Sequence, residues 1–258
     1  MFGVTQLRDV VYVVSGGSST ISRFNATTQQ RLAGIDINGF NGANENNDIA
    51  ACELTCQLYV LDNCECVWRV SSDGADIQLW LTRSRSDTFE TYALSVTSSR
   101  LLVTSRRDRQ LRQFDAAGGD ELRRVGLPDY MLPRHAVESP TGTFIVGHFN
   151  TQLTQYQVSE VSTECQVLRQ FSGSSLGCPQ HIAVDRQGNI FVAEHAFRDS
   201  ANGSILLLDA QLALRRVIIN QHQLSDRLPW RLCYLEQSGQ LLVALDDGGV
   251  AVFDVLQR

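Results

Sequence analysis

Two short apolar segments flank a polar turn in the stretch Pro179-Gln180-His181-Ile182-Ala183-Val184-Asp185-Arg186-Gln187-Gly188-Asn189-Ile190-Phe191-Val192-Ala193-Glu194. Both segments are rich in β-branched and aromatic residues, which favours β-strands. The intervening Arg-Gln-Gly-Asn is typical of a tight hairpin turn, where glycine and asparagine tolerate the required backbone angles. The stretch therefore predicts two antiparallel strands.

The second of these strands recurs six times along the chain. Its central valines are Val13, Val60, Val103, Val146, Val192 and Val243, spaced by 47, 43, 43, 46 and 51 residues. Periods of this length are typical of β-propellers, whose blades are four-stranded sheets. No segment shows a sustained 3.6-residue period, so helices are not expected. We predict an all-β, six-bladed β-propeller of four-stranded antiparallel blades, with three strands in the last blade.

The stretch 179–194 resembles an NHL repeat, whose blade runs from a proline through an apolar strand with Asp and a glycine to an aromatic-Val-Ala-Asp strand. Residues 133–148 and 229–245 follow the same pattern, and the first three copies follow it more loosely. The resemblance implies one NHL-type propeller over residues 1–258 and specifies fold rather than activity. Its blades are expected at roughly 2–40, 41–84, 85–129, 130–174, 175–222 and 223–258.

The composition limits the chemistry that the chain can perform. Of its 258 residues 22 are basic and 28 acidic, and all the basic residues are arginine. Without lysine, Schiff-base chemistry, a Ser–Lys dyad and a P-loop are excluded. The net charge of −6 argues against a wholly basic nucleic-acid-binding protein.

The odd number of cysteines, seven, disfavours a complete disulfide framework and favours a reducing, cytoplasmic location. The longest apolar runs are far shorter than the ~20 residues of a membrane-spanning helix. The first residues also lack the basic-then-apolar order of a signal peptide. We therefore expect a monomeric domain that has no contact with a membrane.

A first candidate site is formed by histidines. His135 and His181 each lie 11 residues before the central valine of their blade, so they occupy equivalent places beside the central channel. His148 and Glu194 end second strands on the same face. Imidazoles and carboxylates that converge on a channel can bind zinc or calcium. Because six-bladed propellers that resemble this chain include metal-dependent lyases and lactonases, a lactonase-like hydrolase or lyase is the alternative function.

The other blades do not continue this histidine pattern. Their equivalent positions are predicted to hold Leu232 or Arg231, Tyr92, Ile49 or Asp48, and Phe2. A third histidine is therefore missing, and we favour the interpretation that His135 and His181 bond neighbouring strand ends.

A second candidate site is a sector of arginines on the same face, formed by Arg83, Arg85, Arg106, Arg107, Arg109 and Arg134. Aromatic residues, Tyr130 among them, are interleaved with these arginines. The planar guanidinium suits carboxylates and phosphates, and aromatic rings can stack unpaired bases. The NHL domains of tripartite-motif proteins bind RNA or proteins through a basic face, so the resemblance points to the same sector.

The sequence thus favours a non-catalytic binding or scaffold propeller. Its ligand is expected to be a protein or peptide, or RNA, held on the loop-rich face by the six arginines and Tyr130. No cofactor is expected for this function, whereas the enzymatic alternative requires zinc or calcium.

Overall fold

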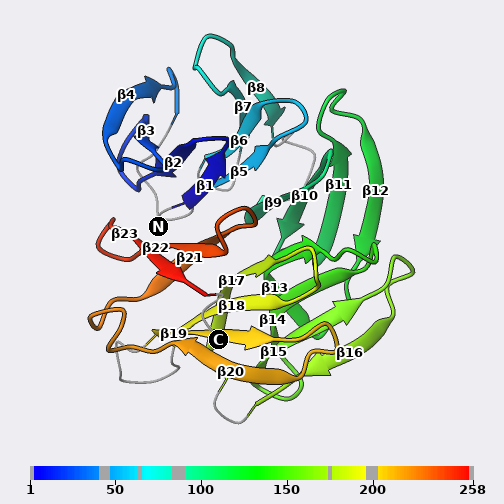
Figure 1. Ribbon diagram of the computed structural model, residues 1–258. Coiled ribbons are helices and arrows are strands. Elements are labelled where there is room, and N and C mark those ends of the chain that lie inside the picture. Colours follow the sequence, from blue (N-terminus) through cyan, green and yellow to red (C-terminus); the bar gives the residue numbers. More distant parts are fainter. Residues whose placement is uncertain are drawn as a thin grey trace.

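The computed structural model describes residues 3–40, 47–62, 66–82, 91–173, 176–195 and 203–255. These residues form 23 strands in six antiparallel sheets (Figure 1). Within the described ranges there is no helix, and so none that could cross a membrane. The predicted all-β, six-bladed propeller with a three-stranded last blade is confirmed.

Each blade is a meander in which neighbouring strands in the chain are neighbours in the sheet. The first strands are β1 (Gly3–Leu7), β5 (Asp48–Cys52), β9 (Ala93–Thr97), β13 (Met131–Glu138), β17 (Cys178–Val184) and β21 (Pro229–Leu235). The second strands are β2 (Val10–Val14), β6 (Gln57–Asp62), β10 (Arg100–Ser105), β14 (Phe144–Asn150), β18 (Ile190–His195) and β22 (Gln240–Leu245).

The third strands are β3 (Thr20–Asn25), β7 (Cys66–Ser71), β11 (Gln110–Asp115), β15 (Gln155–Val161), β19 (Gly203–Leu208) and β23 (Val250–Asp254). The outer strands are β4 (Arg31–Asp36), β8 (Ile77–Thr82), β12 (Glu121–Gly126), β16 (Val167–Phe171) and β20 (Leu214–Ile219). Figure 1 shows the first strands around the centre of the molecule and the outer strands at its periphery.

The core lies between adjacent blades, because each sheet buries apolar side chains on both faces. The central valines of the second strands are buried in all six blades. Between the second and third blades, for example, Tyr59 and Leu61 pack with Leu94 and Leu101. Burying one large apolar side chain contributes about 1.5–3 kcal/mol, which holds one blade against the next.

The ring closes by packing between the sixth and first blades. Val4 and Val13 of the first blade form one buried cluster with Leu242 and Ala244 of the sixth. Each of these two sheets contains strands from its own blade only, in the part of the chain that the structure describes. Side-chain packing, rather than a shared sheet, therefore joins the two blades.

Candidate functional site

Six equivalent residues near the start of the first strands surround the centre of the propeller. We call them the central ring: Gly3, Asp48, Ala93, His135, His181 and Arg231. Each pairs with the residue that follows the central valine of its blade. They therefore occupy the same level of the channel in six successive blades.

This pairing corrects part of the sequence-based alignment. Ala93, rather than Tyr92, is equivalent to the histidines, and Gly3 takes the position that was expected for Phe2, which lies outside the described residues. The sequence left two of the equivalent positions open between neighbouring residues. The pairing assigns them to Asp48 instead of Ile49 and to Arg231 instead of Leu232. The ring thus contains an acid and a base besides its two histidines.

A bulge precedes the ring residue in each of the last three blades. The register shifts between Pro133 and His135, between Pro179 and His181, and between Pro229 and Arg231. A β-bulge inserts one extra residue into a strand, and proline, which has no N–H to donate to the ladder, is common there. The Pro-x-His and Pro-x-Arg motifs therefore set which side chain enters the ring.

Arg231 and Asp48 form a buried ion pair within the ring. Arg231 donates from Nε to Oδ1 of Asp48 over 2.9 Å, and both side chains are almost fully buried. The second carboxylate oxygen of Asp48 accepts the backbone N–H of Leu94 at 2.9 Å. The pair thus joins the sixth blade to the second, and Asp48 also holds the start of the third.

The two histidines continue this pattern of bonds between blades. His135 Nδ1 accepts the backbone N–H of Ile182 at 3.2 Å, and its Nε2 lies 3.2 Å from the carbonyl oxygen of Leu94. His181 Nδ1 accepts the N–H of Leu232 at 3.3 Å. These partners require a neutral ring with its proton on Nε2 in both residues. They are the bonds to neighbouring strand ends that the sequence predicted.

Burial keeps both imidazoles uncharged. Desolvation lowers the pKa of His135 to about 4 and holds the pKa of His181 well below its usual range. The two rings lie against each other with centroids 3.7 Å apart, so a charge on one ring disfavours a charge on the other.

Asp48, His135 and His181 are close enough together to be considered as metal ligands, since their donor atoms lie within 4.8 Å of one another. Both ring nitrogens of His135 already have backbone partners. Among the described residues, His181 Nε2 is the one imidazole nitrogen of the ring without a bond, and the guanidinium of Arg231 lies against the carboxylate. As bonded here, the three residues do not fit a divalent metal ion.

The structure does not bring His148 and Glu194 into the ring. His148 is fully buried, bonds the Ser159 hydroxyl at 2.9 Å, and has its pKa lowered to about 4 by desolvation. Glu194 accepts the N–H of Gly177 at 2.7 Å and the hydroxyl of Ser204 at 2.6 Å. Burial raises the pKa of this carboxyl group. Both side chains bond to their own blade instead of the channel.

The described part of the arginine sector is held mainly by Tyr92. The guanidinium of Arg106 lies 5.7 Å from the centre of the Tyr92 ring, and Arg134 donates to the Tyr92 hydroxyl at 2.8 Å. Arg107 is exposed, and Arg109 has a left-handed backbone angle of φ 51° in the same turn. Tyr130 packs against a core cluster, and Arg83 and Arg85 lie outside the described residues.

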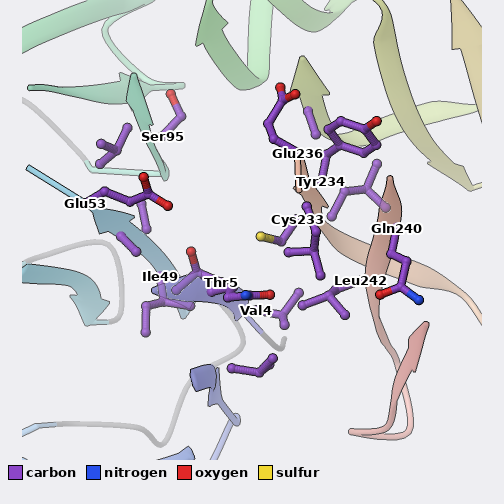
Figure 2. A pocket seen from close by; sticks show the side chains of 18 of the residues that line it. Val4, Thr5, Ile49, Glu53, Ser95, Cys233, Tyr234, Glu236, Gln240 and Leu242 are labelled. Carbon is purple, nitrogen blue, oxygen red and sulfur yellow. The ribbon is translucent and has the colours of Figure 1, made fainter. Parts of the chain in front are cut away.

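A large cavity opens on the opposite face of the propeller. It has a volume of about 1510 Å³ and extends from the histidines of the ring to the turns between first and second strands. Figure 2 shows Glu53 and Glu236 on opposite sides of this cavity, with the apolar side chains of Val4 and Leu242 below them in the view.

Acidic side chains outnumber basic ones in the lining of the cavity. Its lining contains five carboxylates, from Asp9, Glu53, Glu138, Asp185 and Glu236, and two arginines, Arg8 and Arg186. Each carboxylate lies at or just after the end of a first strand. This set was not predicted from the sequence, although three of the acids, Glu53, Asp185 and Glu236, lie seven residues before the central valine of their blade.

Some of these carboxylates have structural partners. Glu138 bonds Arg100 at 2.7 Å and Gln113 at 2.8 Å, and Asp185 accepts backbone N–H groups of its own turn. Glu53 and Glu236 are exposed at the mouth, and Glu236 accepts the backbone N–H of Arg186. Asp9 is exposed in the same lining, so Asp9, Glu53 and Glu236 are the carboxylates best placed to meet a ligand.

Comparison with known proteins finds no matching family model and no matching curated protein. Among solved structures, a hydrazine synthase of Kuenenia stuttgartiensis matches with a TM-score of 0.69 and 12% identity, over 98% of this chain and 76% of that one. A protein of unknown function from Bacteroides caccae matches with a TM-score of 0.67 and 16% identity, over 95% and 90% of the two chains.

The β-propeller domain of Myceliophteria thermophila Cps50 (Swd1) is also similar, with a TM-score of 0.61 and 10% identity over 98% of this chain and 82% of that one. At such low identities these similarities show the fold alone. The six-bladed propeller is supported by the comparisons, and membership of the NHL family stays a prediction.

Proposed function

We propose that the protein is a non-catalytic binding module that takes a positively charged segment of a partner protein or peptide into the cavity. The observation that carries this proposal is the excess of carboxylates in the lining of the cavity, five against two arginines, or four against two once Glu138, which pairs with Arg100, is left out. Charges of one sign around a concave, low-dielectric opening focus the electrostatic field and attract ligands of the opposite sign.

The size of the cavity favours a polypeptide over a small metabolite. Its volume of about 1510 Å³ exceeds the range of ~300–1,000 Å³ that is usual for pockets of drug-sized ligands. Apolar side chains between the acids, such as Val4 and Leu242, offer contacts for aliphatic side chains of the ligand. A peptide that combines arginine or lysine with aliphatic residues matches both features.

The two sites expected from the sequence are weaker candidates. In the central ring, bonds to the backbone occupy three of the four histidine nitrogens, and Arg231 pairs with Asp48. On the face of the arginine sector, Tyr92 already engages Arg106 and Arg134, which leaves Arg107 as the exposed arginine of the described part. The cavity offers a ligand more accessible side chains than either site.

Fluorescence anisotropy with a labelled nona-arginine peptide tests the proposal. We expect saturable binding that weakens about two- to thirtyfold in the double variant Glu53→Gln/Glu236→Gln, since each rim ion pair is worth ~0.2–1 kcal/mol. Asp129→Asn/Asp226→Asn, which removes two exposed carboxylates from the other face, is the matched control and should bind like the unaltered protein. Equal weakening in both variants would attribute binding to net charge and contradict the proposed site.

Labelled nona-glutamate and single-stranded RNA serve as anionic probes for the arginine sector. We expect neither to bind in the range where nona-arginine binds. If either binds more tightly and loses affinity in Arg107→Ala, the arginine sector is the principal binding face and the proposal is wrong.

A further inference from the structure

The third strand of the sixth blade is the least buried of the six third strands. No residue of β23 is buried, whereas its counterparts contain from one buried residue in β3 to five in β15. Val252, at the middle of β23, is 44% exposed. In the other five blades a fourth strand pairs with the third, and none does so in the described part of the sixth.

The sixth blade nevertheless has the residue that prepares the turn into a fourth strand. In each blade this residue lies three positions after the one that pairs with the central valine: Asn25, Ser71, Asp115, Ser162, Asp209 and Asp254. In the first five blades its side chain accepts backbone N–H groups of the turn that leads into the outer strand. Asp254 instead accepts from the Gln240 side chain at 2.9 Å.

The free edge of β23 can be assigned from the hydrogen bonds at its two ends. Leu245 donates to Gly249 and Val255 donates to Gly239, and bonded pairs alternate along an antiparallel ladder. Ala251 and Phe253 therefore face β22, while the backbone N–H and C=O groups of Val250, Val252 and Asp254 point to the open side. An unpaired row of this kind is a template for another strand.

The outer strands of the other blades show which chemistry suits this edge. Four of the five, β4, β12, β16 and β20, carry arginine among branched aliphatic residues. In two blades the arginine pairs with an acid of the third strand or its turn, Glu160 with Arg169 at 3.3 Å and Asp209 with Arg215 at 2.9 Å. Asp254 is the register equivalent of Asp209, so a basic residue suits the same place.

The strand β23 also borders the cavity. Val250 and Val252 line it together with Phe24 and Ala26 of the first blade, and Val250 packs with Phe24 and Ala26 against one buried cluster.

We infer that β23 binds an extended segment of a partner protein, with arginine or lysine among Val, Leu and Ile residues, which completes the sixth blade by β-strand addition. Backbone bonds to Val250 and Val252 provide affinity, and side chains that alternate along the segment provide specificity. The inference extends the proposed function to a second contact, which does not depend on Glu53 and Glu236.

A labelled peptide with the sequence of residues 210–220, the turn and outer strand of the fifth blade, is the probe. We expect it to bind the full chain and to lose at least about tenfold in affinity in Val252→Pro, which removes an outward N–H but no bond to β22. Val252→Thr keeps the N–H and the β-branched shape, so it should bind within about twofold of the unaltered protein. Absence of saturable binding, or equal binding to both variants, would overturn the inference.

A graft keeps the test decisive if Val252→Pro does not fold. Replacing residues 255–258 by the sequence of residues 210–220 supplies the turn and strand in the same chain. We expect the graft to raise the Tm and to abolish binding of the free peptide. A graft with proline in place of the valine that corresponds to Val217 should show neither change. If the unmodified graft left both Tm and peptide binding unchanged, the edge would not accept a strand. Loss of nona-arginine binding in Glu53→Gln/Glu236→Gln would not affect either result.

Discussion

Arg231 of the sixth blade and Asp48 of the second, 183 residues apart in the sequence, form an ion pair of 2.9 Å in which both side chains are almost fully buried. Between them the first blade contributes Gly3 to the ring, so its ring position has no side chain. The guanidinium thereby reaches past one blade to the next. The pair connects the sixth blade to the second in a propeller whose first and last blades share no sheet in the described residues.

Removing one partner of this pair should destabilise the protein strongly. In Arg231→Leu the buried carboxylate of Asp48 loses its countercharge, and breaking a buried pair in this way typically costs about 3–5 kcal/mol. Urea unfolding of the variant should show a loss of this size in the free energy of unfolding. The double variant Arg231→Leu/Asp48→Leu, which removes both charges, should recover much of the loss.

The exposed pair Arg227–Asp247, at 3.1 Å, provides the control for this prediction. Its side chains are 36% and 49% exposed, and surface pairs contribute a median of about 0–1 kcal/mol. Arg227→Leu should therefore change the free energy of unfolding by no more than that amount. If Arg227→Leu and Arg231→Leu lowered the free energy of unfolding by similar amounts, the prediction that the buried Arg231–Asp48 pair matters more for stability would be wrong.

The sequence was sufficient for the fold because its signals are local. Each blade consists of short apolar strands and polar turns, and strands that are consecutive in the sequence pair with each other. The six central valines gave the number of blades. The position of His135 and His181 beside the channel followed from the same repeat. Their bonds to Ile182 and Leu232 followed because a strand edge at the channel needs partners for its N–H groups.

The candidate site in the cavity was harder to predict because it depends on which ends of the strands open into that cavity. The arginines are dense in the sequence, yet Arg106 lies over the Tyr92 ring and Arg134 donates to the Tyr92 hydroxyl. The acids of the mouth are spread singly over five blades, so no local window of the sequence contains a cluster of them. The bulges before His135 and Arg231 also shift the register by one residue, which composition alone does not reveal.

Gly3→Ala should disturb the ring by crowding it. A methyl group at this position would lie 2.8 Å from the Val14 side chain and 2.9 Å from the backbone nitrogen of Ile49, closer than real contacts allow. Overpacking of this kind typically costs about 1–3 kcal/mol, which thermal unfolding would show as a lower Tm. Gly126→Ala is the matched control, because nothing lies within 4 Å of its added methyl group. It should leave Tm unchanged or raise it.

Binding of nona-arginine should weaken as salt is added. Glu53 and Glu236 are exposed, so their attraction for the peptide is screened once the Debye length falls from about 10 Å at 0.1 M to about 3 Å at 1 M ionic strength. Anisotropy titrations over this range should show a steady rise in Kd. The double variant Glu53→Gln/Glu236→Gln should show a shallower rise, and an equal slope in both proteins would place the binding charges elsewhere.

The stability of the protein should fall as the pH is lowered from about 6.5 towards 4, because buried histidines are held uncharged. Desolvation lowers the pKa of His135 and of His148 to about 4 from the ordinary value of 6.5. Between these two values the unfolded chain binds more protons than the folded protein, so protons favour unfolding as the pH decreases. Each such histidine should cost about 1 kcal/mol of stability between pH 7.5 and 5.5.

His148→Gln removes one of these titrating groups, and His222→Gln, at an exposed position, is the control. Urea unfolding at both pH values should show a smaller pH-dependent loss in His148→Gln than in the unaltered protein and His222→Gln. The same loss in all three proteins would mean that His148 is not held neutral by the fold.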